Sequence, residues 1–165
     1  MEHVEIERKY LIRMPSQAFL SKLPSSGIEQ VYILSPEGAR ERIRRRTYAG
    51  GTVLCTHTVK KGLSALSRIE IEEEIGEERY RELLSRADPA RSVLHKKRYI
   101  YRYDGQDFEI DVFPFWNDRA LMELELGDEE QPLRLPPEIE VVREVSADKR
   151  YTNSAIAREI PRETI

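Results

Sequence analysis

The chain has no long uninterrupted apolar segment, and it contains a single cysteine, Cys55. A membrane-spanning helix needs about 20 consecutive apolar residues, and a disulfide needs two cysteines, so the sequence predicts neither. No leader with basic residues followed by an apolar segment opens the chain. A lone cysteine is typical of a reducing compartment, and we therefore expect a cytoplasmic location.

The chain also lacks an excess of basic residues. Lys and Arg number 27 against 30 Asp and Glu, which gives a net charge of −3, although charged residues make up 35% of the chain. A dedicated nucleic-acid binder usually shows a clear basic excess, so this balance argues against that class. We expect a small-molecule ligand, no nucleic-acid or membrane partner, and either a monomer or a homodimer.

Several common catalytic motifs are missing. The sequence contains no GxxxxGK[ST] loop and no GxGxxG loop, so neither P-loop nor dinucleotide binding is indicated. It has no GxSxG segment for a serine nucleophile, and its three histidines do not have the spacing of a metal site. The chemistry must therefore be sought among the other charged residues.

Alternating apolar and polar residues predict a mostly antiparallel α+β domain that spans residues 1–165 without a linker or an internal repeat. Strands are expected at 4–12, around Tyr32, and at 39–48, 52–60, 68–75, 93–103, 106–113, 120–127 and after Pro137. Short helices are expected at 15–24, 77–87 and 153–160, the last with Asn153 as its cap. Asp104-Gly105 predicts a tight hairpin turn. Eight or nine strands are enough for a sheet to close into a barrel.

One face of many strands is charged at every second position. In the first strand, Glu5, Glu7 and Lys9 share a face, because successive side chains of a strand point to opposite sides. The sign of the charge differs between strands, with basic residues on some and acidic residues on others. The charged pairs of the later strands are Arg42 and Arg44, Glu70 and Glu72, Lys96 and Arg98, Glu109 and Asp111, and Glu123 and Glu125.

Two structures explain this pattern. An antiparallel sheet with one wet face alternates in the same way. A closed sheet with the charged faces inside would form a charged tunnel, which is stable only if acids meet bases or bound ions. In a tunnel, Arg and Lys could bind a polyphosphate, and Glu-x-Glu pairs could hold hard divalent cations. Periodicity alone leaves both structures open.

The segment Glu5-Ile6-Glu7-Arg8-Lys9 resembles the Glu-x-Glu-x-Lys signature of the CYTH superfamily, the triphosphate tunnel metalloenzymes. The other charged strands follow in the order of that family: Arg42-x-Arg44, Thr58-Val59-Lys60, Arg68-x-Glu70-x-Glu72, Lys96-x-Arg98, Glu109-x-Asp111 and Glu123-x-Glu125. Residues 144–153 are similar to its closing Lys-Arg-Tyr-x-Asn segment. The resemblance covers nearly the whole chain, and the short single-domain bacterial members are the most similar.

This resemblance implies an eight-stranded antiparallel β-tunnel, a closed barrel with a charged interior and a few flanking helices. It assigns metal binding to Glu5, Glu7, Glu123 and Glu125, and phosphate binding to Lys9, Arg42, Arg44, Lys60, Lys96 and Arg98. Glu70, Glu72 and Asp111 would be tunnel acids that position water or a second cation, with Lys9 beside the reacting groups. Lys61 competes with Lys60 for the tunnel position, and Tyr32 and Lys149 are further candidate contacts.

The function implied by the resemblance is hydrolysis of a triphosphate with Mg²⁺ or Mn²⁺ as cofactor, and inorganic triphosphate is the favoured substrate. One alternative is a class IV adenylate cyclase that makes cyclic AMP from ATP, for which the sequence offers no identifiable nucleobase pocket. The other is a non-catalytic module that binds polyphosphate or a phosphorylated metabolite. Phosphate binding alone would not require four clustered carboxylates, which favours the enzyme.

Overall fold

The structure is a computed structural model that describes residues 2–35 and 39–165. The strands of this part of the chain form one antiparallel sheet in the order β5-β4-β3-β2-β6-β7-β8-β1-β9, with an additional β5–β1 pairing. Their bounds are β1 Glu2–Arg13, β2 Ser25–Ile33, β3 Arg40–Tyr48, β4 Val53–Gly62, β5 Ser67–Ile75, β6 Leu94–Tyr103, β7 Gln106–Val112, β8 Arg119–Glu125 and β9 Val141–Glu144.

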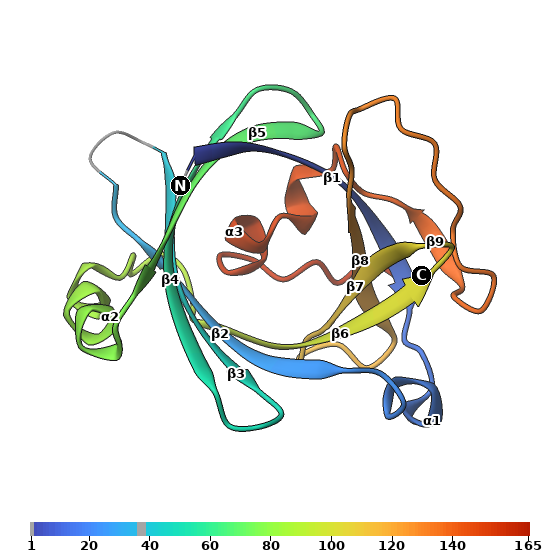
Figure 1. Ribbon diagram of the computed structural model, residues 1–165, viewed down its shortest axis with the longest axis horizontal. Coiled ribbons are helices and arrows are strands. Elements are labelled where there is room, and N and C mark those ends of the chain that lie inside the picture. The colour runs from blue at the N-terminus through green and yellow to red at the C-terminus, as the bar shows by residue number, and fades with distance from the viewer. Residues whose placement is uncertain (1, 36–38) are drawn as a thin grey trace.

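The long first strand closes the sheet into a barrel. Its first part, Glu2–Ile6, pairs with β5, and its second part, Glu7–Arg13, pairs with β8. The remaining edge of the second part, at Tyr10–Ile12, pairs with the short strand β9. Eight strands therefore form a ring and β9 is an addition to it, as Figure 1 shows. This closed antiparallel barrel confirms the predicted fold class.

The helices are short. They are α1 Gln17–Leu20, α2 Glu77–Leu83 with its 3₁₀ continuation η1 Leu84–Arg86, the 3₁₀ turn η2 Lys149–Tyr151, and α3 Asn153–Ile156. In Figure 1, α1 and α2 lie outside the ring of strands, whereas α3 is seen within it. Among the described residues, no helix has the length and apolar character that a membrane crossing requires.

The structure confirms the predicted turn at residues 104–105 and corrects the predicted N-cap of the last helix. Asp104 and Gly105 have φ values of 52° and 72°, which confirms the predicted tight hairpin between β6 and β7. The predicted cap of the last helix is wrong by one residue. Thr152 is the N-cap, with extended backbone and a hydroxyl that accepts a hydrogen bond from the Ala155 amide at 3.1 Å, so Asn153 is already helical.

Apolar side chains on the outer face of the barrel account for most of the core. Tyr10, Phe108 and Met122 on neighbouring strands pack with Leu20 of α1. On the opposite side, apolar residues of β2, β3 and β4 pack against Tyr80 and Leu83 of α2. Since these outward faces are covered, the alternating charged faces of the strands must point inward. The wet outer sheet considered above is therefore not the structure.

A third apolar cluster fills one end of the barrel interior. Leu11 of β1 and Leu121 of β8 meet there with Phe113, Tyr151 and Ile156, all at most 1% exposed. Leu11 and Leu121 continue the inward faces that carry Glu7, Lys9 and Glu123. The inside of the barrel thus changes from charged to apolar along β1, and the C-terminal segment that carries η2 and α3 packs on the apolar part.

Candidate functional site

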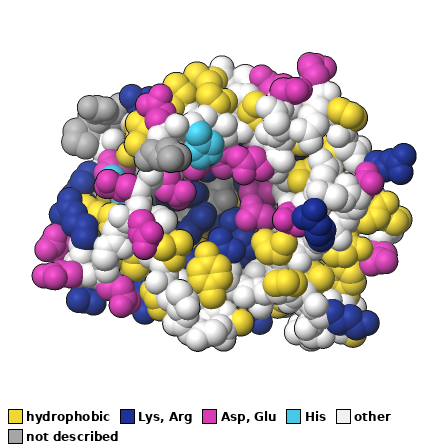
Figure 2. Space-filling view, viewed as in Figure 1, with side chains coloured by type: hydrophobic (Ala, Val, Ile, Leu, Met, Phe, Trp, Pro, Cys, Tyr) yellow, Lys and Arg dark blue, Asp and Glu magenta, His cyan; other side chains and the backbone are white. Residues whose placement is uncertain are grey.

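A charged cavity of about 200 Å³ lies inside the barrel. Figure 2 shows a hollow near the centre of this face in which basic and acidic side chains gather. The cavity is lined by Glu5, Glu7, Lys9, Tyr32, Arg40, Arg42, Arg44, Lys60, Arg68, Glu70, Arg98, Glu109, Glu123, Glu125, Thr152, Asn153 and Ser154. The lining has almost no apolar side chain, so the cavity is built for an ionic ligand. Its volume is below the roughly 300–1,000 Å³ of drug-sized sites, which favours a compact ligand.

Carboxylates gather where β1 runs beside β8. Glu7 is paired in register with Glu125, and Lys9 with Glu123. Burial, reinforced by repulsion from Glu123, raises the pKa of Glu7 to about 7. Burial also disfavours the charged form of Glu123. Lys9, whose Nζ lies 3.2 Å from Oε1, outweighs burial together with Arg98 and Lys96, and these cations hold the pKa of Glu123 at about 2. This wall therefore carries more negative charge than its own cations neutralise.

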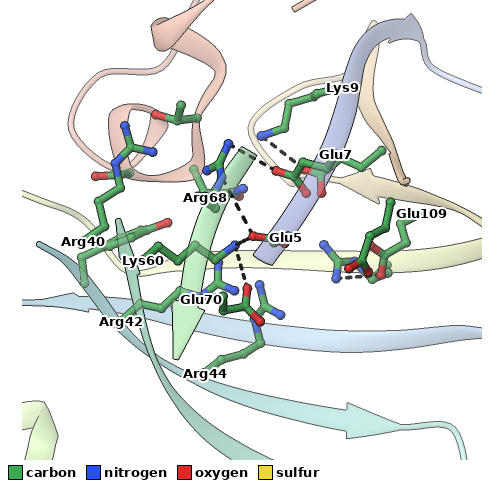
Figure 3. Close-up of a pocket in the computed structure, with 17 residues that line it drawn as sticks. Glu5, Glu7, Lys9, Arg40, Arg42, Arg44, Lys60, Arg68, Glu70 and Glu109 are labelled. Atoms are coloured by element: carbon green, nitrogen blue, oxygen red, sulfur yellow. Dashed lines mark ion pairs between the residues drawn. The ribbon is translucent and has the colours of Figure 1, made fainter. Parts of the chain in front are cut away.

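The second carboxylate group of the cavity is already paired with cations. Lys60 Nζ lies 2.7 Å from Glu5 Oε2 and 3.3 Å from Glu70 Oε2, and Arg68 lies 4.0 Å from Glu5 and 3.9 Å from Glu7. Figure 3 shows these side chains converging from β1, β4 and β5. Lys60 is thus the lysine that faces the cavity, whereas Lys61 is exposed and does not line it. The question left open by the sequence is answered in favour of Lys60.

Two arginines of β3, Arg42 and Arg44, supply positive charge to the cavity without a paired carboxylate. In the described part of the chain, no carboxylate forms an ion pair with Arg42 or Arg44, and Arg42 Nε is buried without a hydrogen-bond acceptor. Burial, followed by repulsion from Arg42 and Arg98, lowers the pKa of Arg44 to about 9. Guanidinium groups that are largely removed from water and contact no carboxylate are unfavourable unless an anion completes them. We infer that this wall of the cavity binds an anion.

Behind the cavity lies a compact ion cluster. Asp111 accepts hydrogen bonds from Lys96 Nζ at 2.7 Å and from Arg98 Nε at 2.8 Å, and Arg98 also reaches Glu109 at 2.9 Å. Of these residues, only Arg98 and Glu109 line the cavity. Burial opposes the charge on Asp111, but Arg98 and Lys96 outweigh it and hold its pKa far below the usual range. The direct ligand roles implied for Lys96 and Asp111 therefore stay predictions, and the observed contacts hold Arg98 in place.

Three further sequence candidates are placed as follows. Tyr32 lines the cavity and is 8% exposed. Glu72 does not line it, and its Oε1 accepts a hydrogen bond from Thr58 at 3.0 Å. Lys149 is exposed and lines an adjoining depression instead, together with Arg40, Lys60 and Arg68. The structure thus brings Glu70 and Tyr32 together with the arginines, and leaves Glu72 and Lys149 outside the central cavity.

Several lining residues were not among the predicted site residues. Arg68 and Glu109 stand within the quoted strand motifs, at positions that alternate with outward residues, so periodicity could have found them. His3 does not line the cavity, but it lies on the same face of β1, and its Nε2 is 3.7 Å from Glu70 and 3.9 Å from Glu125. Thr152, Asn153 and Ser154 carry no such signal, because only the path of the chain brings that segment into the barrel.

The acidic wall suits a hard divalent cation by its chemistry. Glu5, Glu7, Glu123 and Glu125 all line the cavity from adjacent strands, and carboxylate oxygens are the ligands that Mg²⁺ and Mn²⁺ prefer. The repulsion that raises the pKa of Glu7 is the charge excess that a cation would relieve. Among the described residues, no three acidic, histidine or cysteine side chains already form a cluster that could hold a metal. Ion binding would therefore require these side chains to reorient.

Comparison with known proteins finds one family and two similar proteins that carry the same name, inorganic triphosphatase. The family model of the CYTH domain matches residues 3–151. An inorganic triphosphatase of Nitrosomonas europaea is 34% identical over 160 residues, which is 95% of this chain and 99% of that protein. An inorganic triphosphatase of Acetivibrio thermocellus is 30% identical over 155 residues, or 93% of each chain.

Solved structures agree with these relatives. A crystal structure of an inorganic triphosphatase is 31% identical, with a TM-score of 0.59, and the match covers 95% of this chain and 99% of that one. The PH1819 protein of Pyrococcus horikoshii, with a TM-score of 0.55, is 21% identical over 76% of this chain and 80% of that one, and it supports the fold alone.

Proposed function

The chain belongs to the CYTH domain family, and on that premise we propose that it is a divalent-metal-dependent triphosphatase whose substrate is inorganic triphosphate. The observation that carries the proposal is the opposition, within one cavity, of arginines without acidic partners on β3 and an excess of carboxylates on β1 and β8. A linear triphosphate needs cations along its length and a metal ion to neutralise the rest of its charge.

In this proposal the basic residues of the cavity bind the phosphates and the carboxylates bind the metal ion. Arg42, Arg44 and Arg98 would bind the phosphate oxygens, with Lys60 and Lys9 nearer the carboxylates, so that the ligand is held in line before it reacts. Their fixed charges would stabilise negative charge as it spreads over the transferred phosphoryl group. Glu5, Glu7, Glu123 and Glu125 would hold Mg²⁺ or Mn²⁺, which supplies charge neutralisation at the phosphates when bound. Of the three predicted tunnel acids, only Glu70 is among the residues that line the cavity, and we propose that it orients the attacking water.

The proposal is tested by incubating the pure protein with inorganic triphosphate, ATP, thiamine triphosphate or pyrophosphate, with and without Mg²⁺ or Mn²⁺, and analysing all products. We expect orthophosphate and pyrophosphate from inorganic triphosphate, loss of activity after chelation, and recovery when the metal is restored. Cyclic AMP as the main product from ATP would favour the cyclase. Tight metal-dependent binding without any product would favour the binding module.

A matched set of arginine variants on one strand tests the cationic wall. Arg42→Ala and Arg44→Ala should each raise KM for triphosphate about tenfold or more, because a charged hydrogen bond to phosphate is lost. Arg45→Ala is the control, since Arg45 points outward and pairs with Glu77 at 2.9 Å. Steady-state kinetics measures KM and kcat, and thermal unfolding measures the stability of each variant. We expect all three variants to stay folded, and unchanged KM and kcat in Arg42→Ala and Arg44→Ala would contradict the proposed binding wall.

A further inference from the structure

Gln30 connects two residues of the cavity wall without lining the cavity itself. It lies on β2, is 0% exposed, and its Oε1 accepts hydrogen bonds from Arg44 Nη2 at 2.8 Å and from Arg44 Nε at 3.1 Å. Its Nε2 donates to the hydroxyl of Tyr32 at 2.8 Å. Arg44 and Tyr32 both line the cavity, and thus one buried amide holds two of the groups that face the ligand.

The donor inventory fixes the direction of these bonds. A guanidinium has only donors, so the amide oxygen of Gln30 must face Arg44 and its NH₂ group must face Tyr32. The Tyr32 oxygen is then an acceptor in that bond, which leaves its own O–H free to donate elsewhere. Since Tyr32 lines the cavity, that proton can be directed at an anion bound there.

The neutrality of the amide also matters. Arg98, on β6, is held by Asp111 and Glu109, whose charges offset its own. Arg44 receives a neutral acceptor instead, so its geometry is fixed while its charge remains available. A carboxylate at position 30 would hold Arg44 more strongly, yet its negative charge would offset the charge of Arg44. It would also accept a hydrogen bond from the Tyr32 hydroxyl, which could then no longer donate to the ligand.

We propose that Gln30 is a positioning residue that sets the affinity of the cavity for polyphosphate anions, because it holds Arg44 without offsetting its charge and turns the Tyr32 hydroxyl proton toward the ligand. This inference rests on the proposed function for the identity of the ligand. It predicts that a carboxylate at position 30, which would bind Arg44 more strongly than the amide does, weakens ligand binding.

The test compares Gln30→Glu, Gln30→Met and the wild type. Calorimetric titration with inorganic tripolyphosphate, without divalent cation so that no turnover is expected, measures binding, and thermal unfolding measures stability. Gln30→Glu should bind about tenfold or more weakly, and Gln30→Met only about threefold more weakly, because Met leaves the charge of Arg44 intact. Stability should rank the other way, since Met leaves a buried guanidinium without its acceptor. Gln17→Glu, the same charge change on the exposed helix α1, is the control and should bind as the wild type does.

The outcomes separate this inference from the proposed function. Equal affinities of the wild type and Gln30→Glu, or affinities that follow the order of the unfolding midpoints, would overturn the role of Gln30 even if triphosphate is hydrolysed. The expected order of affinities without hydrolysis in a parallel assay with Mg²⁺ would support Gln30 and overturn the hydrolase. A wild-type protein that binds no tripolyphosphate would contradict both.

Discussion

Glu7→Gln is expected to lower triphosphate hydrolysis by about a hundredfold or more at saturating substrate while leaving the fold at least as stable as the wild type. Glu7 stands among like charges, and burial together with Glu123 raises its pKa to about 7. A neutral amide of the same shape therefore removes repulsion from the folded state. The same change removes a proposed metal ligand, so activity and stability should move in opposite directions.

Glu5→Gln sharpens this test, because Glu5 is in the opposite electrostatic situation. Its carboxylate lies 2.7 Å from Lys60 Nζ, and its pKa is lowered because Lys60 and Arg42 outweigh the effect of burial. Removing its charge should lower activity and also the midpoint of thermal unfolding. Steady-state phosphate release, the Mg²⁺ concentration for half-maximal activity, and thermal unfolding distinguish the two variants.

Glu78→Gln on the exposed face of α2 is the control for both variants and should behave as the wild type. Wild-type activity in Glu7→Gln, with an unchanged Mg²⁺ requirement, would show that this carboxylate is not a ligand. A collapse of stability in Glu7→Gln would show that the negative charge is needed for the fold, which the geometry of β1 and β8 does not predict.

Alternation along the strands was enough to predict which side chains share a face. Lys9, Arg42 and Glu123 all lie on the predicted faces, and all line one cavity. What alternation could not decide is whether those faces point inward, because a wet outer face has the same period. That choice depends on closure between β1 and β5, which are separated in sequence by β2, β3 and β4, and only the family resemblance predicted it.

Depth within the barrel was the second property beyond the reach of periodicity. Lys96 and Arg98 share a face and both pair with Asp111, yet only Arg98 lines the cavity, whereas the Lys96 side chain is fully buried. The role of Gln30 could not be predicted from alternation either. An amide between charged strands carries no charge signal, and its role follows only from its hydrogen bonds with Arg44 and Tyr32.

The buried ion cluster of Lys96, Arg98 and Asp111 gives the largest expected effect on stability. Asp111→Asn should lower the free energy of unfolding by about 3–5 kcal/mol, because it leaves Lys96 buried without its paired carboxylate and leaves Arg98 with Glu109 alone. Asp107→Asn on the same strand is the control, since Asp107 pairs with Arg102 at an exposed position and should change stability by less than about 1 kcal/mol. Urea unfolding at neutral pH measures both variants.

The pH dependence of unfolding gives an independent check on Asp111. Its pKa is held below the ordinary value of 3.8, so its contribution to stability is fully present above about pH 4 and is lost as the pH falls toward its folded pKa. The wild type should therefore lose stability on acidification below about pH 4 more steeply than Asp111→Asn. If Asp111→Asn instead keeps the stability and acid response of the wild type but loses activity, Asp111 faces the ligand, as the family resemblance implies, and the ion cluster is not what holds Arg98.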